Sequence, residues 1–346
     1  MEKINTMDID WSKLTFSYRP VTCHIEYHWK DGAWDNGELK TEPYINLSIA
    51  AECLHYGQAA FEGMKAYRGE DNRIRIFRPE MNARRLMASA RRTCMAPVPE
   101  EMFCEAVERV VKANSEWVPP YGTGATLYIR PLLLGTGPQI GVAPASEYTF
   151  IVLVVPVGAY YKGGLKAVKA CIVDEYDRAA PRGTGAVKLA GNYAASLLPH
   201  EMAKEQGYAV DLYLDAVEHK YVEEFGSSNF IGITKDGRYV TPQSSSVLPS
   251  ITNNGLQQVA KDLGIPVEVR PIDFEKEIGE FAEVAACGTA VVITPISEIV
   301  RLSNGKHYQI PTGESCGPIC QKIYNAYTDI QWGKAPDTHG WIKILD

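Results

Sequence analysis

The first half of the chain contains short strand-like runs of apolar residues, and the two strongest are rich in β-branched and aromatic residues. Runs of this kind occupy residues 23–29, 44–50, 125–134 and 148–157. A hairpin is predicted where residues 64–68 and 73–77 flank the turn sequence GEDN. Apolar residues at helical spacing follow Pro79 and recur over 99–114, so the first half predicts a sheet with two helices.

The second half mixes both periods along the chain. Strands are predicted at 166–174, 211–214, 266–271 and 284–295, the last of them interrupted at Gly288. A hairpin is predicted at 231–240, and helices at 193–207, 249–264 and 318–332. This order favours an α+β fold with mixed sheets over a doubly wound parallel sheet. The sequence PVGAYYKGG, with one proline and three glycines, reads as a linker. We therefore expect a small domain at 1–155, a linker at 156–165 and a larger domain at 166–346.

Composition narrows the class of protein. The 346 residues are 45% hydrophobic and 22% charged, with a formal net charge of −7, which argues against nucleic-acid binding and favours a small-molecule partner. The N-terminus lacks an apolar signal core, and the longest apolar run, 150–157, is too short to span a bilayer. Eight scattered cysteines without a Cys-x-x-Cys pair predict reduced thiols and no metal site. We expect a cytoplasmic protein without membrane association.

Candidate chemistry centres on the segment RGTGAVKLAGNYAAS at 182–196. Its three glycines allow tight turns or close backbone approach around Lys188. Asn192 is the expected N-cap of the following helix, which leaves Lys188 on a connection just ahead of it. Most lysines are solvated surface groups, and no complete P-loop or dinucleotide-binding motif surrounds this one. A functional role for Lys188 therefore has to be argued from other segments of the sequence.

That support comes from three later segments: EEFGSSN at 223–229, PSIT at 249–252 and CGTA at 287–290. The first supplies a carboxylate, and the others supply turns or a helix start with backbone N–H groups suited to phosphate. An amine, a carboxylate and phosphate-sized nests are the parts that a pyridoxal phosphate site requires.

Some choices stay open on residue type alone. The helix after Pro79 carries four arginines, any one of which could enter a pocket: Arg84, Arg85, Arg91 and Arg92. Arg130 within an apolar strand either faces solvent or meets an anion. Glu223 and Glu224 would face opposite sides of a strand, so either could be the functional carboxylate.

A family resemblance covers nearly the whole chain. It rests on FEGMKAYRG (61–69), FRPEMNARRL (77–86), YIRPLL (128–133), VPVGAYYKGG (155–164), VKLAGNYAASL (187–197), EEFGSSNF (223–230), LPSIT (248–252) and GTA (288–290). In register, these motifs resemble the branched-chain amino acid aminotransferases of pyridoxal phosphate (PLP) fold type IV. The resemblance implies a homodimer, a small α/β domain, a larger barrel-like α/β domain, and a cofactor cleft between them covered by the linker.

The same resemblance assigns the cofactor contacts. Lys188 resembles the Schiff-base lysine, which also moves the proton of the substrate Cα. Glu224 resembles the partner of the ring nitrogen, and Arg85 the phosphate-binding arginine. The other implied cofactor contacts are Tyr193 on the phenolic oxygen, Ser228, Asn229, Ile251, Thr252 and Thr289.

The substrate contacts are also implied by resemblance. Phe61, Tyr128 and Tyr160 match the lining of an apolar pocket, and Tyr56, Ile140 and Val142 match residues that the other subunit contributes. Ser227 and the backbone of Ala290 match the site for the α-carboxylate. Arg130 either receives glutamate or braces the tyrosines. Some family members carry a redox Cys-x-x-Cys after the Gly-Thr-Ala turn; residues 290–294 here read AVVIT, so thiol regulation is not expected.

The expected activity is reversible amino transfer between L-leucine, L-isoleucine or L-valine and 2-oxoglutarate, by a ping-pong cycle of PLP and its pyridoxamine form. An aliphatic pocket separates side chains that differ by one methylene by only ~1–3 kcal/mol, so all three should be accepted. Two alternatives within the fold are a D-amino acid aminotransferase and an aminodeoxychorismate lyase. A third is a non-catalytic metabolite-binding protein, whose ligand binding would survive loss of Lys188.

Overall fold

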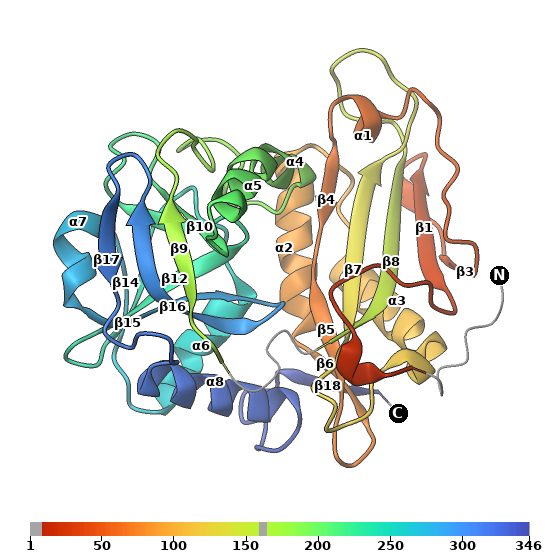
Figure 1. Cartoon of the computed structure of the whole chain (residues 1–346). Coiled ribbons are helices and arrows are strands. Elements are labelled where there is room, and N and C mark those ends of the chain that lie inside the picture. Colours follow the sequence, from red (N-terminus) through yellow and green to blue (C-terminus); the bar gives the residue numbers. More distant parts are fainter. Residues whose placement is uncertain (1–8, 159–164, 346) are drawn as a thin grey trace. The chain divides into compact units, whose positions relative to one another are not determined.

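The computed structural model describes residues 9–158 and 165–345, and these divide into two compact units (Figure 1). The first unit contains the chain up to residue 158, the segment Lys188–Ala190 and the C-terminal residues from Asp329 onward. The second contains the remaining described residues, including Gly191–Thr328. The sequence-based boundary places 329–346 with the larger domain, whereas their contacts place them with the first unit.

The described residues of the first unit form one antiparallel sheet. Its main strand order is β18 (Ile342–Leu345), β6 (Ile74–Phe77), β5 (Met64–Arg68), β7 (Thr126–Gly135), β8 (Tyr148–Val157), β1 (His24–Lys30) and β2 (Ala33–Trp34). Strand β3 (Glu38–Lys40) pairs with β1, and β4 (Ala59–Phe61) pairs with β7. Strand β18 joins through the register Ile342↔Phe77, which explains why the C-terminus belongs here. The hairpin predicted at 64–77 is confirmed.

Two amphipathic helices pack on this sheet, α2 (Pro79–Arg92) and α3 (Glu100–Ala113). Helix α3 lies against β1 and β8, and α2 lies against α3 and β4. Phe103 of α3 is fully buried, with its ring 5.8 Å from that of Phe150 on β8. The predicted start of α2 and both predicted ends of α3 are correct to within one residue, because apolar residues recur at helical spacing after Pro79 and Pro99.

The strand predicted at 44–50 is wrong. These residues form no strand, and Tyr44 and Ile49 are 79% and 90% exposed. Apolar residues alone do not make a strand, because a strand needs a neighbour to receive its backbone hydrogen bonds. A short helix, α1 (Glu52–His55), follows this segment.

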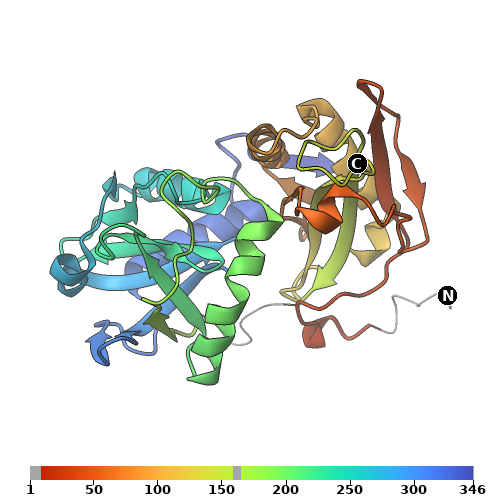
Figure 2. The same cartoon turned by 90° about the horizontal axis from the view of Figure 1, so that it is seen from above.

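The second unit is built on a closed barrel (Figure 2). Its ring runs through β11 (Val222–Phe225), β10 (Val210–Leu214), β9 (Val168–Ile172), β16 (Val292–Arg301), β15 (Phe281–Gly288) and β12 (Ser228–Thr234). The ring closes because β11 pairs with both β10 and β12. Strand β9 is parallel to β10 and β16, while the other ring pairs are antiparallel. The mixed sheet expected from the order of elements is confirmed.

Further elements extend the barrel: β13 (Tyr239–Pro242), β14 (Val267–Arg270), β17 (Lys306–Gln309), α4 (Ala190–Ala195), α5 (Leu197–Glu205), α6 (Ile251–Asp262), α7 (Phe274–Glu277) and α8 (Pro318–Gln331). Helix α5 packs on β10, and α6 packs on β14 and β15. Leu212, Phe225, Phe230 and Phe281 are among the buried residues that form the core. The interruption predicted at Gly288 within 284–295 is where the chain turns, so this stretch is two antiparallel strands, β15 and β16.

Single turns of 3-10 helix occur at η2 (Trp11–Lys13), η3 (Ser115–Trp117) and η4 (Ile278–Glu280). Among the helices of residues 9–158 and 165–345, none combines the length and the apolar character that crossing a bilayer requires.

Candidate active site

Lys188 is held by its main chain beside β4. Its N–H donates to Ser89 Oγ of α2 at 2.9 Å, and its carbonyl accepts from the Phe61 N–H at 3.1 Å. Leu189 forms a β-bridge with Ala60. The Lys188 amine lies 4.6 Å from the centre of the Phe61 ring. The main chain therefore fixes the lysine on both sides, and its amine lies over an aromatic face.

The turn before the lysine is stabilised by Asn192. Its Nδ2 donates to the carbonyls of Thr184 and Val187 at 2.8 and 2.9 Å, and its Oδ1 accepts from Thr184 Oγ1 at 2.7 Å. The prediction of Asn192 as an N-cap is wrong, because α4 already begins at Ala190. The Asn192 side chain hydrogen-bonds to the preceding loop instead of capping a helix. A second helix, α5, starts at Leu197. Tyr193 lies on α4 and is half-buried.

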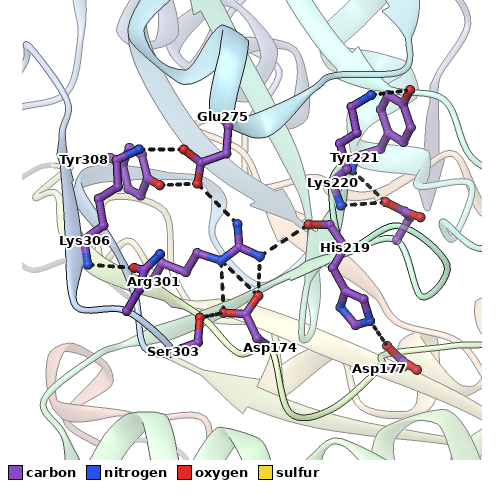
Figure 3. A network of polar contacts seen from close by, with 12 residues as sticks. Asp174, Asp177, His219, Lys220, Tyr221, Glu275, Arg301, Ser303, Lys306 and Tyr308 are labelled. Atoms are coloured by element: carbon purple, nitrogen blue, oxygen red, sulfur yellow. Dashed lines mark hydrogen bonds and ion pairs between the residues drawn. The ribbon is translucent and has the colours of Figure 1, made fainter.

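The segment that leads to Lys188 is anchored at its start as well (Figure 3). Asp174, just after β9, pairs with Arg301 of β16 at 2.6 Å and accepts from Ser303 Oγ at 2.5 Å. Arg301 also pairs with Glu275 of α7 at 3.3 Å. Both members of the Asp174–Arg301 pair are about one-seventh exposed, at 14% and 16%. The barrel therefore fixes the end of the strand from which the lysine segment departs.

Burial separates Arg85 from the other arginines of α2. The Arg85 side chain is 11% exposed, whereas Arg84 is 61% exposed and pairs with Glu100. Arg91 and Arg92 are exposed. Arg85 donates from Nε and Nη2 to the two oxygens of Glu62, at 2.8 and 2.7 Å. Arg85 is thus the one arginine of this helix that is held inward.

The aromatic residues expected around the substrate meet on one face of the first unit's sheet. Arg130 lies 4.8 Å from the Phe61 ring centre and 5.2 Å from that of Tyr128. Its Nη2 donates to the Tyr128 hydroxyl at 3.0 Å. A Cβ on Gly63 would overlap that hydroxyl, so glycine is required there for Tyr128 to take this position. Arg130 therefore braces Tyr128, one of the two roles that the sequence left open.

A second group of expected substrate contacts in the first unit lies at the surface. Tyr56, Ile140 and Val142 are 49%, 70% and 82% exposed, and the Tyr56 hydroxyl donates to the Ile140 carbonyl at 2.8 Å. This hydrogen bond joins two loops that are 84 residues apart in sequence. Tyr160, the third aromatic residue expected in the pocket, lies outside the described residues.

Glu224 is the centre of a buried polar cluster in the second unit. Arg178 pairs with Glu224 at 2.9 Å, and the two side chains are 7% and 4% exposed. Glu224 also accepts from the Leu248 N–H and from Asn229 Nδ2, both at 3.0 Å. Arg178 donates in addition to the carbonyl of Ser246. Arg178 therefore supplies the positive counter-charge of Glu224 and ties it to the loop that precedes α6.

The neighbouring glutamate has a different environment. Glu223 is 2% exposed, and its Oε1 accepts from Ser244 Oγ at 3.0 Å. Burial raises the pKa of the Glu223 carboxyl, although hydrogen bonds from Ser246 and Ser244 oppose that shift. Glu224 has an arginine as its ion-pair partner, whereas Glu223 is bonded to neutral hydroxyls. The environment of Glu224 suits a group that stays a carboxylate.

The remaining expected contacts lie on two turns and one helix start of the second unit. Asn229 of β12 is paired in register with Cys287 of β15, so the 226–227 turn and the turn after Gly288 lie at the same end of these strands. Ser228 begins β12 and Ser227 is exposed; Thr289 and Ala290 follow β15. Ile251 and Thr252 form the first turn of α6, and Ser250 caps it by accepting from the Asn253 N–H at 3.1 Å.

Comparison with known proteins identifies the family. Residues 59–299 match the model of the family described as amino-transferase class IV. A branched-chain-amino-acid aminotransferase of Haemophilus influenzae is 48% identical over 345 residues, which is 98% of this chain and 99% of the relative. The chain belongs to the class IV aminotransferases.

Solved structures agree with the fold of this class IV aminotransferase. The branched-chain amino acid aminotransferase of Escherichia coli has a TM-score of 0.76 at 29% identity, over 92% of this chain and 98% of that one. The enzyme from Thermoproteus uzoniensis, solved with norvaline, has a TM-score of 0.74 at 28% identity, over 92% and 98%. The expected fold, a mixed α/β architecture with a barrel-like unit, is confirmed.

The side chains of this aminotransferase fit a pyridoxal phosphate, and a similar solved branched-chain enzyme holds the pyridoxamine form. Lys188 offers an amine for the aldehyde, and Glu224 offers a buried carboxylate for a ring nitrogen. The first N–H groups of a helix have no acceptor within the helix, so the start of α6 suits an anion, and Arg85 suits phosphate by charge. Within residues 9–158 and 165–345, no cluster of three or more His, Cys, Asp or Glu side chains is arranged to hold a metal ion.

Three residues of the site were not predicted from the sequence: Glu62, Ser89 and Arg178. Glu62 interrupts the apolar run AAFEGM, and a carboxylate in such a run indicates a paired charge. Ser89 lies four residues after Arg85, on the same face of α2. No pattern in the sequence indicates that Arg178 reaches Glu224, which is 46 positions later.

Proposed function

We propose that this class IV aminotransferase is a branched-chain-amino-acid transaminase that works with pyridoxal 5'-phosphate. The observation that carries the proposal is the position of Lys188, whose main chain is fixed at Ser89 and Phe61 and whose amine lies over the Phe61 ring. Relatives named as branched-chain enzymes match over nearly the full length. A non-catalytic binding protein would need no such lysine.

Different residues of the chain have different roles in the proposed reaction. The cofactor supplies an electron sink for the electron pair left on the substrate Cα. Lys188 Nζ would hold the cofactor through its aldehyde carbon and, once the substrate amine has displaced it, would accept the proton from the substrate Cα and deliver it to the former aldehyde carbon of the cofactor. Glu224 would accept a hydrogen bond from the ring nitrogen and keep it protonated, and Tyr193 would donate to the phenolic oxygen. The phosphate would be held by Arg85, by the α6 start with Ile251 and Thr252, and by Thr289. Ser228 and Asn229 would complete these contacts.

The substrate side chain contacts aromatic residues. Phe61 and Tyr128, braced by Arg130, would line an apolar pocket for leucine, isoleucine or valine. Tyr160, which the resemblance adds to this pocket, lies outside the described residues. Ser227 and the Ala290 backbone receive the α-carboxylate. Similar branched-chain enzymes have been solved in complex with N-(5'-phosphopyridoxyl)-L-glutamate and with 4-methylvaleric acid. These ligands support glutamate and an aliphatic acid as the two substrate classes, with 2-oxoglutarate as amino acceptor.

A second copy of the chain completes the proposed pocket. Tyr56, Ile140 and Val142 are exposed, and a hydrogen bond joins Tyr56 to the Ile140 carbonyl. We assign these three residues to the partner's pocket in a homodimer. Light scattering should give a mass of about two chains. Cell fractionation tests the cytoplasmic location that we propose.

One experiment tests the reaction and the lysine together. The purified enzyme is assayed with 2-oxoglutarate and either L-leucine or D-alanine, and is then reduced with borohydride for peptide mapping. We expect turnover of L-leucine, little with D-alanine, and a reduced cofactor label on Lys188. Lys188→Ala should lose activity by roughly 10²- to 10⁴-fold or more, while the exposed-lysine control Lys169→Ala should not. Preference for D-alanine, release of pyruvate from aminodeoxychorismate, or a label elsewhere would refute the assignment.

A further inference from the structure

We propose that Glu62 is the positioning residue of the phosphate site, because it sets the orientation of the Arg85 guanidinium. The inference rests on the proposed function, in which Arg85 binds the cofactor phosphate. Glu62 directly follows β4 and would not touch the cofactor itself. Its role is to hold Arg85 in one orientation before the phosphate arrives.

The geometry of the pair supports this role. Glu62 Oε1 accepts from Arg85 Nε at 2.8 Å, and Glu62 Oε2 accepts from Nη2 at 2.7 Å. Two parallel bonds between a carboxylate and a guanidinium define the plane of the guanidinium as well as its distance. A guanidinium has five N–H groups, so this contact uses only part of its donor capacity.

The Glu62 carboxylate is itself fixed from other sides. Asn82 Nδ2 donates to Oε2 at 2.7 Å, and the Gly63 N–H donates to the same oxygen at 3.4 Å. Glu62 is 0% exposed and Asn82 is 2% exposed. A carboxylate buried this deeply is tolerated when it is paired and hydrogen-bonded, and it then has little freedom to move.

The same short stretch of chain also orients the lysine. The Phe61 N–H donates to the Lys188 carbonyl at 3.1 Å, and the Glu62 N–H donates to the Pro131 carbonyl of β7 at 2.8 Å. Adjacent residues in extended backbone point to opposite sides. Phe61 therefore contacts Lys188 while Glu62 contacts Arg85, and one dipeptide fixes both groups within the first unit.

A matched pair of ligands tests the proposal without relying on catalysis. The full-length enzyme is stripped of cofactor, and the dissociation constants of pyridoxal 5'-phosphate and of unphosphorylated pyridoxal are measured by absorbance titration. The ratio of the two constants isolates the phosphate contribution. Variants are Glu62→Gln, Arg85→Gln and, as control, Glu100→Gln, which removes the partner of the exposed Arg84.

We expect Arg85→Gln and Glu62→Gln each to lower the preference for the phosphorylated ligand by roughly tenfold or more, and Glu100→Gln to leave it unchanged. The double variant should lose little beyond the Arg85 variant, since both act through one contact. If Glu62→Gln fails to fold, Glu62→Asp keeps the charge but shortens the reach, and it should still lower the preference.

The outcomes separate the two claims. If Arg85→Gln lowers the preference but neither Glu62 variant does, the positioning role is overturned while the phosphate assignment stands. A stronger preference in Glu62→Gln would mean that Glu62 only neutralises Arg85, which also overturns it. If Arg85→Gln leaves the preference unchanged, the assigned phosphate contact fails and the inference fails with it.

Discussion

The main-chain N–H of Lys188 donates to the side-chain oxygen of Ser89 at 2.9 Å, across 99 positions of sequence. Ser89 Oγ in turn donates to the Arg85 carbonyl at 3.0 Å, one turn earlier on α2. One helix thus carries the proposed phosphate arginine and also fixes the backbone of the proposed catalytic lysine.

Ser89→Ala should weaken the enzyme through this contact. Ser89 is 0% exposed, so its loss removes the acceptor of the Lys188 N–H in a buried place. We expect the free energy of unfolding to fall by about 1–3 kcal/mol and the single-turnover rate with L-leucine to fall as well. Thr93→Ala is the control, because Thr93 Oγ1 makes the same type of bond within α2, to the Ser89 carbonyl at 3.0 Å. Equal single-turnover rates in the two variants would contradict a role at Lys188.

Gly63→Ala should impair substrate binding. The added methyl would overlap the Tyr128 hydroxyl and force that ring or β5 to shift. Overpacking of this kind costs ~1–3 kcal/mol, and we expect KM for L-leucine to rise roughly tenfold with a smaller change in kcat. Gly279→Ala is a suitable control, because a Cβ there meets no atom within 4 Å among the described residues. An unchanged KM would show that Tyr128 does not line the pocket.

Arg178→Ala should destabilise the buried Glu224 carboxylate, because it removes the arginine of this ion pair. Breaking a buried ion pair by removing one partner costs about 3–5 kcal/mol, because the remaining charge is left uncompensated. We expect a lower melting temperature of the cofactor-free protein and weaker binding of pyridoxal 5'-phosphate. Arg182→Ala, an exposed arginine of the same segment, should change neither. If Arg178→Ala binds cofactor like the wild type, Glu224 does not depend on this pair.

Asp215 should give the enzyme part of its acid sensitivity. Burial raises the pKa of this carboxyl, but N–H groups of Glu218, Tyr221, Lys220 and Val217 outweigh that effect and lower it below the ordinary 3.8. A lowered folded-state pKa contributes stability above the ordinary pKa, and that contribution is lost as the pH falls through the folded value.

Asp215→Asn should therefore be less stable than the wild type at neutral pH, and the difference should shrink below about pH 4. Denaturant unfolding across this range measures it, with the exposed Glu218→Gln as control. A difference that stays constant with pH would exclude this carboxylate as the source.

Local patterns were sufficient for most elements of the fold. Helices α2, α3, α6 and α8 follow from their apolar spacing and from proline or glycine near their ends, and the hairpin at 64–77 follows from its turn sequence. These features depend on residues a few positions apart, which the chain itself brings together. The lysine segment was recognisable from its glycines together with the three later segments, and the choice of Glu224 over Glu223 came from the family resemblance.

Contacts between distant segments needed the tertiary structure. Residue type and spacing could not choose among the four arginines on α2; the family resemblance selected Arg85, and its burial beside Glu62 is visible only in the structure. The sequence also did not predict that Ser89 contacts Lys188 or that Arg178 contacts Glu224. It predicted a strand at residues 44–50, but these residues have no strand partner among the described residues. Composition and spacing determine which elements can form, but a hydrogen bond or ion pair between remote positions exists only after the sheets have paired. That pairing decides which buried charges meet.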